Sequence, residues 1–347
     1  MDRELLDRIR SALRRDGIDA WMVFSSEYSE DPHFPWVIDE SPPSRHLLVV
    51  PARAQPFVIA SSLDSSMIRT DKRIFSSRAE FIKILKSLPY KKVALNYSRK
   101  GIEGISHNDF LTLRRYLKAN VGPADFLADI RAVKTKKQLQ AHRRACKDTM
   151  LAIDAIPSLI RKGSTEISLR NALYDIIDDE AFPTIVASGP NTRNPHHMPG
   201  NRKIREGDLL LVDIGSKMDM ACADVSRTYA IGRATKRMQD CYCQVRSALD
   251  AVISRISPGA RASSAAKAVP FEMHHAIGHP LGLSVHDVSP MIFSKSRDIF
   301  REGNVLAIEP AIYSPYGIRI EDDVIVSKNG TVRLTRAPAE LPILKLN

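Results

Sequence analysis

The feature that most constrains this chain is a pair of hairpin-like segments with acidic residues in the middle of apolar strands. In the first, LLLVDIG and ACADVSRTYAIG flank a polar turn and contribute Asp213 and Asp224. In the second, VLAIEPAIY and GIRIEDDVIV flank a turn with proline at its second position and contribute Glu309 and Glu321. A single aspartate on such a strand is usually an edge, turn or hydrogen-bonded residue. Four carboxylates in two similar hairpins indicate one common site.

The two carboxylates of each hairpin are expected to face each other. Asp213 and Asp224 are equidistant from the centre of their turn, which predicts direct opposition with Cβ atoms about 5 Å apart. Glu309 and Glu321 are expected to lie nearly opposite each other in the same way. Two carboxylates that close raise each other's pKa, so a positive group should lie between them.

Histidines cluster close to these hairpins in the sequence. His274-His275-Ala276-Ile277-Gly278-His279 and His286 lie between the hairpins, and His196-His197 lies upstream, so six of the ten histidines fall in two short clusters. Carboxylates together with one imidazole suit a pair of divalent first-row cations. Two such cations, about 3.5–4 Å apart, would share bridging carboxylates. The pattern therefore predicts a dinuclear metal centre.

The length of 347 residues favours two domains. Short apolar runs at 21–24, 46–51, 56–60 and 92–97, with helical segments at 79–88 and 108–119, predict an α/β domain over residues 1–125. Gly122-Pro123 is the expected break near its end. Long helical segments at 136–162 and 165–180, followed by strands at 184–188 and 209–215, open a catalytic domain over residues 126–347.

Charge, cysteine content and hydropathy exclude several other classes of protein. The net charge is +11, but the basic residues are scattered apart from a cluster at Arg131 to Lys147, which we interpret as a solvated helix face. No nucleic-acid-binding motif accompanies it. No apolar run is long enough to span a membrane, and the first residues predict an amphipathic helix rather than a signal peptide. Four cysteines without a CxxC pair indicate a reducing, cytoplasmic setting.

Six segments in order resemble the signature segments of the pita-bread metallopeptidases, and most of all those of the aminopeptidase P and prolidase branch. They are SGPNTRNPHH, GDLLLVDIG, ADVSRTY, HHAIGHPLGLSVHD, AIEPAIY and GIRIEDD. The resemblance implies an α/β N-terminal domain of the creatinase type, followed by an α+β pita-bread catalytic domain. It also implies hydrolysis of Xaa-Pro bonds at the N-terminus of peptides.

The same resemblance implies roles for individual residues. The implied metal ligands are Asp213, Asp224, His279, Glu309 and Glu321. Glu309 also takes a proton, and His196 and His286 are the implied catalytic histidines. The implied substrate-binding residues are His275, Tyr313 and Arg319. Two divalent metal ions are expected, with manganese first and cobalt or zinc as alternatives. The implied partners are short peptides with proline at the second position and a second copy of the chain, with no nucleic acid and no membrane.

Some positions depart from the family pattern. Ala276 and Pro280 stand where the family usually has glycine, and the segment between Asp224 and His279 is short. Glu30 to Ser44 replaces a strand of the N-terminal domain, which leaves the choice between dipeptides and longer peptides open. Two alternatives remain: a catalytically silent binding module, and a creatinase-like hydrolase that does not act on peptides.

Overall fold

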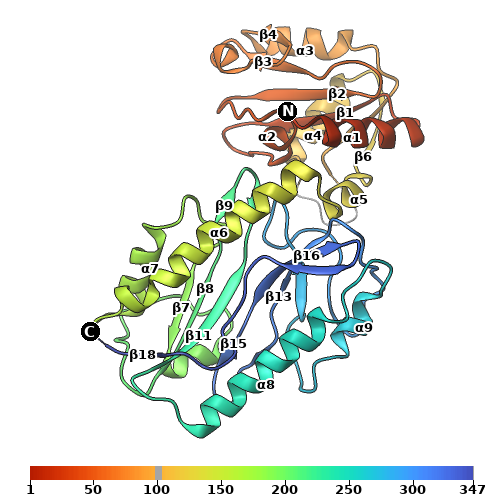
Figure 1. The fold of residues 1–347 in the computed structure, drawn as a ribbon. Helices are drawn as coiled ribbons and strands as arrows, with labels where there is room; N and C mark the ends of the chain where they lie inside the picture. Colours follow the sequence, from red (N-terminus) through yellow and green to blue (C-terminus); the bar gives the residue numbers. More distant parts are fainter. Residues whose placement is uncertain (98–103, 347) are drawn as a thin grey trace. The chain divides into compact units, whose positions relative to one another are not determined.

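The computed structural model describes residues 1–97 and 104–346, which divide into two compact units, Met1–Arg131 and Ala132–Asn347 (Figure 1). The predicted α/β and α+β organisation is confirmed. Gly122 and Pro123, the expected break, lie in the last strand of the first unit. Among residues 1–97 and 104–346, no helix is both long enough and apolar enough to cross a bilayer.

The first unit is built on a six-stranded sheet in the order β4-β3-β2-β1-β5-β6. Strand β2 runs antiparallel to both of its neighbours, and the other neighbouring strands pair in parallel. The strands are β1 (Ala20–Ser25), β2 (His46–Pro51), β3 (Phe57–Ser61), β4 (Lys72–Phe75), β5 (Lys92–Leu95) and β6 (Asn120–Pro123). The sequence did not predict β4 and β6, because β4 is largely exposed and β6 contains Gly-Pro, which only an edge strand tolerates.

Helices cover the sheet of the first unit. They are α1 (Arg3–Arg15), α2 (His33–Ile38), α3 (Arg78–Ser87), α4 (His107–Tyr116) and α5 (Leu127–Ala132), with the 3-10 turn η1 (Ser65–Met67). Ser77 and Ser106 cap α3 and α4 by accepting a backbone N–H of the first turn. Phe81 of α3 and Leu113 of α4 pack in one apolar cluster with alternate residues of β1, so both helices lie on the same face.

The atypical segment from Glu30 to Ser44 forms α2 and is fixed to the sheet by buried polar contacts. Asp31 Oδ1 accepts the ring Nδ1–H of His33 at 2.7 Å, and Asp31 Oδ2 accepts from Asn96 Nδ2 at 2.7 Å. Asn96 in turn accepts from the Trp21 indole. A satisfied buried network of this kind fixes one conformation. The segment is therefore an integral part of the N-terminal unit.

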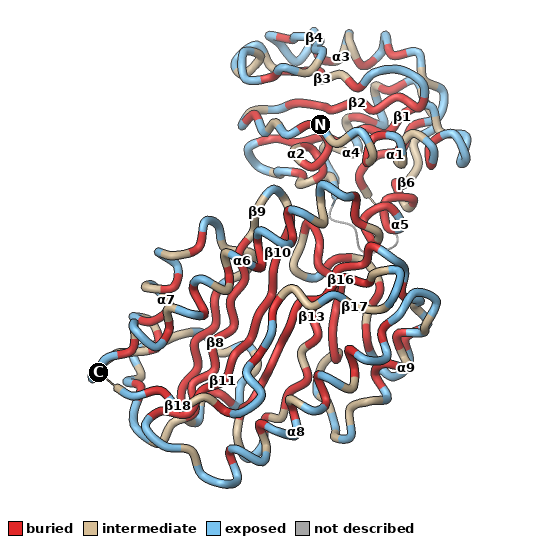
Figure 2. Tube along the Cα trace, viewed as in Figure 1, coloured by how far each residue is buried: buried red, intermediate tan, exposed pale blue. Residues whose placement is uncertain are grey.

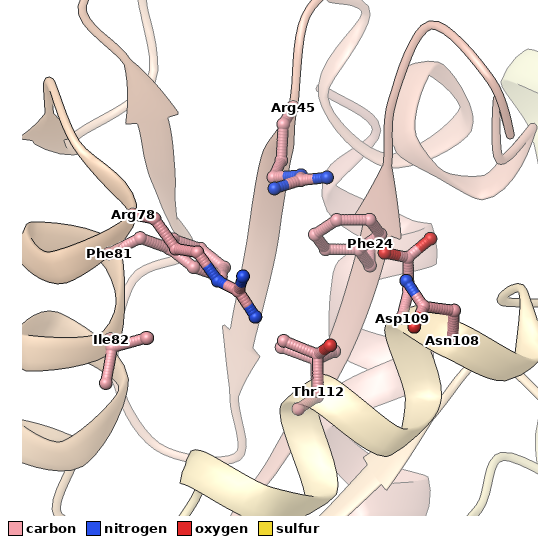
Figure 3. Close-up of a pocket in the computed structure, with 9 residues that line it drawn as sticks. Phe24, Arg45, Arg78, Phe81, Ile82, Asn108, Asp109 and Thr112 are labelled. Atoms are coloured by element: carbon pink, nitrogen blue, oxygen red, sulfur yellow. The ribbon is translucent and has the colours of Figure 1, made fainter.

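A cavity of about 240 Å³ opens in this first unit. Its lining residues are Phe24, Arg45, Arg78, Phe81, Ile82, Asn108, Asp109, Thr112 and Leu113. Figure 3 shows the Arg45 and Arg78 side chains extending into the space beside Phe24 and Thr112. The Arg45 guanidinium lies 5.9 Å from the centre of the Phe24 ring. No site residue predicted from the sequence lines this cavity.

The second unit contains two four-stranded sheets, β18-β11-β8-β7 and β12-β13-β16-β17, and two short hairpins. The first sheet holds β7 (Ile185–Ser188), β8 (Leu209–Ile214), β11 (Val225–Ile231) and β18 (Ile343–Leu344). The second sheet holds β12 (Gly278–Pro280), β13 (Val305–Ile308), β16 (Asp322–Ser327) and β17 (Gly330–Arg333). The hairpins are β9 (Lys217–Met218) with β10 (Ala221–Cys222), and β14 (Ala311–Ile312) with β15 (Ile318–Arg319).

Each sheet of the second unit carries its own helices. These are α6 (Lys136–Leu159), α7 (Glu166–Tyr174), α8 (Lys236–Ile253) and α9 (Ala262–Ala266), with the 3-10 turn η2 (Gly189–Arg193). α6 and α7 pack against β8 and β11, whereas α8 and α9 pack against β13 and β16. Figure 2 shows β8, β11 and β13 buried along their length. The fold therefore contains two similar sheet-and-helix halves.

Helix α7 ends earlier than the sequence predicted. The helical segment was expected over 165–180, but α7 stops at Tyr174 with Asp175 as its C-cap. Asp178, Asp179 and Glu180 follow within the predicted range. Acidic residues are unfavourable at the carboxyl end of a helix because its dipole is negative there.

Candidate active site

The hairpin that carries Asp213 and Asp224 has a different register from the expected one. Asp213 pairs with Ser226, and Asp224 lies two residues further towards the turn. The turn is centred on Asp219 and Met220, which both have positive φ angles of 47° and 63°, as in a two-residue hairpin turn. The predicted direct opposition is therefore wrong. The two carboxylates are diagonal neighbours on one face of the hairpin, because side chains two positions apart share a face.

The second hairpin has the register that the sequence predicted. Ile308 pairs with Asp322, and Ala311 pairs with Arg319. The two pairings belong to one continuous register, which places Glu309 opposite Glu321. These two glutamates lie where the chain leaves β13 and enters β16.

Three of the four carboxylates lie around the ring of His279. His279 Nε2 lies 3.4 Å from Asp224 Oδ2, 3.8 Å from Glu309 Oε1 and 3.8 Å from Glu321 Oε1. One ligand atom from each of Asp224, His279 and Glu321 falls within 4.8 Å of the other two. Asp213 completes the group through Arg319, whose guanidinium donates to its carboxylate.

Arg319 and Ser226 connect the two hairpins. Arg319 Nε donates to Ser226 Oγ at 2.7 Å, and Ser226 Oγ donates to Glu321 Oε2 at 2.9 Å. Arg319 Nη1 donates to the Tyr313 hydroxyl at 3.0 Å. His275 Nδ1 donates its proton to the carbonyl of Ala276, so Nε2 of the neutral ring is an acceptor. The Tyr313 hydroxyl therefore donates to His275 Nε2 at 2.9 Å.

Three of the carboxylates and His286 have shifted pKa values. Burial, followed by repulsion from Asp213, raises the pKa of Asp224. Burial, followed by repulsion from Asp224, raises the pKa of Glu321. Burial also raises the pKa of Glu309. Burial, with His279 and His196 nearby, lowers the pKa of His286 to about 4. Several carboxylates packed this closely can all be ionised only if positive charge lies between them.

The cluster lines a cavity of about 410 Å³. Its walls include the ten residues predicted from the sequence except Tyr313, which lies behind His275. The rings of His279 and His286 meet edge to face at 4.3 Å. Apolar side chains form the remaining wall, namely Phe182, Ile185, Val285 and Met291. The cavity lining thus combines acidic and apolar side chains, which suits a small substrate with an apolar part.

The donor set fits divalent cations. Asp213 Oδ1, Asp224 Oδ1 and Glu321 Oε1 are buried without a hydrogen-bond partner in the part of the chain that the structure describes. Unpaired buried acceptors cost free energy. Carboxylate oxygens with one imidazole nitrogen are ligands suited to such ions, and coordination would satisfy these atoms.

Two supporting residues were missed in the sequence. Ser226 lies two positions from Asp224, and Asp323 lies two positions from Glu321, so strand alternation already placed both on the acidic face. Asp323 Oδ2 accepts from the Asp224 backbone N–H at 3.0 Å and from the Cys146 thiol at 3.2 Å. Burial raises the pKa of Asp323 to about 7. The Asp323 carboxyl group thus holds the backbone of Asp224 in place.

Comparison with known proteins agrees with this architecture. The model of the family described as "Metallopeptidase family M24" matches residues 140–328, more than half of the chain. A Xaa-Pro dipeptidase of Pyrococcus horikoshii is 25% identical, with 97% of this chain and 98% of that protein covered. The structure of a Xaa-Pro dipeptidase from Bacillus anthracis matches with a TM-score of 0.87 at 23% identity, over 98% of this chain and 99% of that one. An X-Pro aminopeptidase structure from Thermotoga maritima matches with a TM-score of 0.85 at 23% identity, over 99% and 100%.

Fold and site together define a metallopeptidase with a small N-terminal α/β unit. The chain belongs to metallopeptidase family M24.

Proposed function

We propose that the chain hydrolyses the bond between an N-terminal residue and a following proline, with two divalent cations bound. The observation that carries this proposal is the convergence of four carboxylates and His279 in one cavity, with several buried oxygens unpaired. The preference for proline is supported by the Xaa-Pro dipeptidase of Pyrococcus horikoshii, which aligns along nearly the whole chain.

The proposed ligands of the cations are Asp213, Asp224, His279, Glu309 and Glu321. Manganese is the expected ion, with cobalt and zinc as alternatives, because an oxygen-rich set with one imidazole suits each of them. When bound, the cations would supply Lewis acidity and an activated water at neutral pH.

Glu309 is the proposed proton acceptor. Its side chain is 15% exposed, compared with 9% for Asp213 and 2% for Glu321, so it is the carboxylate most open to the cavity. His275 Nδ1 lies 3.5 Å from Glu309 Oε2. Glu309 can therefore receive a proton from a water in the cavity and pass it to the departing amine.

His196 and His286 are the proposed donors to the reacting amide. Both line the cavity, His286 against His279 and His196 on the loop that follows η2. Ring N–H groups held at this position can stabilise the negative charge that develops on the carbonyl oxygen. His275, Tyr313 and Arg319 form a hydrogen-bonded row that we propose orients the bound peptide.

The apolar wall suits the ring of proline. A Xaa-Pro bond is a tertiary amide without an N–H, so its recognition depends on packing rather than on donation from the amide. Phe182, Ile185, Val285 and Met291 offer such packing. The contact predicts that proline binds better than alanine at the second position.

The test is an activity panel with metal analysis. Purified protein is stripped with a chelator, reloaded with manganese, cobalt or zinc, and assayed on Ala-Pro, Ala-Ala and a longer Ala-Pro peptide. We expect about two metal ions per chain and at least about tenfold higher kcat/KM for Ala-Pro than for Ala-Ala. Equal rates on the two dipeptides would remove the proline preference, and full activity without metal would remove the metal mechanism.

We also propose that the chain forms a homodimer in a reducing cytoplasm. Two-fold homodimers are the commonest oligomers of soluble proteins. The four cysteines, Cys146, Cys222, Cys241 and Cys243, are all free thiols. Light scattering at micromolar concentration tests the dimer, and a monomer alone would contradict it.

A further inference from the structure

The His196 ring has no hydrogen bond of its own within residues 104–346. Its backbone N–H donates to Asn194 Oδ1 at 3.2 Å, and the residue is exposed. Its orientation is therefore set by the backbone of the surrounding loop. We call residues 188–200, which include η2 and His196, the His196 loop.

A buried carboxylate outside the cavity accepts hydrogen bonds from both ends of this loop. Glu166, the first residue of α7, has no exposed surface. At one end, Glu166 Oε1 accepts from the Ser188 backbone N–H and hydroxyl, both at 2.8 Å, and from Asn191 Nδ2 at 2.9 Å. At the other end, Glu166 Oε2 accepts from His197 Nε2 at 2.8 Å and from the Gly200 backbone N–H at 3.3 Å.

The backbone of α7 adds one further bond to the end of the loop and one just beyond it. Glu166 N–H donates to the carbonyl of Arg202 at 3.1 Å, and Ile167 N–H donates to that of Gly200 at 3.0 Å. Burial opposes ionisation of Glu166, but bonds from His197, Asn191 and Ser188 lower its pKa below the ordinary value. The group is therefore an anion at neutral pH, and charge-assisted bonds to an anion are stronger than neutral ones.

The β14–β15 hairpin also contacts the His196 loop. Arg319 Nη1 donates to the carbonyl of Pro195 at 3.3 Å, and Gly317 N–H donates to Thr192 Oγ1 at 3.2 Å. A side chain at Gly317 would meet the Thr192 carbonyl oxygen at 1.7 Å, so the loop lies directly against the hairpin. Glu166 adds its own hydrogen bonds to the same loop.

We infer that Glu166 is the positioning residue of the active site: its five accepted hydrogen bonds fix the His196 loop so that the His196 ring faces the substrate. The inference rests on the proposed function for the role of His196. Glu166 does not line the cavity and touches no proposed metal ligand. Its removal should therefore disturb the chemistry without changing metal binding.

The experiment compares Glu166→Gln, His196→Ala and the double variant, with Asp19→Asn as control. Asp19 also accepts two backbone N–H groups, from Lys91 and Lys92, but lies in the N-terminal unit. We expect Glu166→Gln to lower kcat on Ala-Pro by about 10- to 100-fold, with manganese content unchanged and KM changed less. Amides of residues 188–200 should exchange with solvent at least about tenfold faster. Asp19→Asn should change neither quantity.

The double variant separates positioning from general damage. If Glu166 acts through His196, adding Glu166→Gln to His196→Ala should change kcat by less than about twofold. Multiplying effects would overturn the inference, and so would unchanged kcat and exchange in Glu166→Gln. Asn191→Ala, which removes one of the five bonds, should act in the same direction more weakly and serves if Glu166→Gln does not fold. A parent protein inactive on every Xaa-Pro peptide would refute the proposed function instead, while the exchange measurement would still decide whether Glu166 fixes the loop.

Discussion

Arg227 and Asp322 form a buried ion pair that joins the two sheets of the catalytic unit. Arg227 Nη2 donates to Asp322 Oδ1 at 2.9 Å, and both side chains are almost fully buried. Arg227 Nη1 also donates to the carbonyl of Glu321. Because Arg227 lies on β11 and Asp322 on β16, this pair fixes the distance between the hairpins that carry the acidic site.

Removal of Asp322 should destabilise the catalytic unit strongly. Asp322→Ala leaves the Arg227 charge buried without its carboxylate partner. It also removes the acceptor of the Ala337 backbone N–H, which donates to Asp322 Oδ2 at 3.2 Å. Such a loss costs about 3–5 kcal/mol. Calorimetric unfolding measures the change. Asp240→Ala, which breaks the exposed Lys236–Asp240 pair, should lower the free energy of unfolding far less than Asp322→Ala. Similar costs for the two variants would contradict the role of burial.

Metal removal should lower the melting temperature of the catalytic unit. Without cations, repulsion between the crowded carboxylates lowers the free energy of unfolding. A ligand that binds only the folded state stabilises it by about 2.7 kcal/mol when its concentration is 100 times its Kd. Calorimetry with and without a chelator measures the shift. Asp224→Asn should lower both the metal content and this shift. A melting temperature that is insensitive to manganese would exclude the proposed centre.

Loss of His286 should affect rate but not metal content. Its ring packs against His279 without belonging to the proposed ligand set. His286→Ala should therefore retain its manganese and lose about 100-fold or more in kcat, as expected when an oxyanion donor is removed. Elemental analysis and steady-state kinetics on Ala-Pro check the two parts. A loss of metal together with activity would assign His286 to the ligands instead.

The sequence was most informative where local alternation determines the structure. The carboxylates of the two hairpins could be assigned to one site because period-2 alternation and turn positions are local properties. The register of the first hairpin could not be predicted from the sequence. Its turn places Asp219 and Met220 at positive φ without the glycine that usually marks such a turn.

Contacts between distant residues were beyond local inference. Glu166 and His197 are separated by 31 positions, and nothing in the pattern of α7 distinguishes this glutamate from a solvated one. The buried helix α2 was missed for a related reason: its stability comes from Asp31 and His33 meeting Asn96, a contact across 65 positions. The domain limits and the roles of the site residues stay predictions.

Acid should destabilise the N-terminal unit through His46. Burial lowers the pKa of His46 to about 4, and its Nε2 atom is buried with no hydrogen-bond partner among residues 1–97 and 104–346, so a second proton would find no acceptor among them. Because the unfolded chain binds this proton near pH 6.5 and the folded one only near pH 4, the free energy of unfolding falls as pH drops between these values. The loss approaches roughly 3 kcal/mol. His46→Gln should flatten this part of the curve, measured by chemical denaturation across pH 4–7. An equal slope in the variant would assign the effect elsewhere.

The contact between Arg319 and Asp213 has a consequence for how the finished protein acquires its ions. A guanidinium already inside the acidic cluster offsets part of its repulsion. We therefore expect the chain to reach its native fold before any cation binds, so that metal loading is a separate, reversible event. We expect the ion carried by each molecule to follow the supply in its surroundings rather than the conditions of its synthesis.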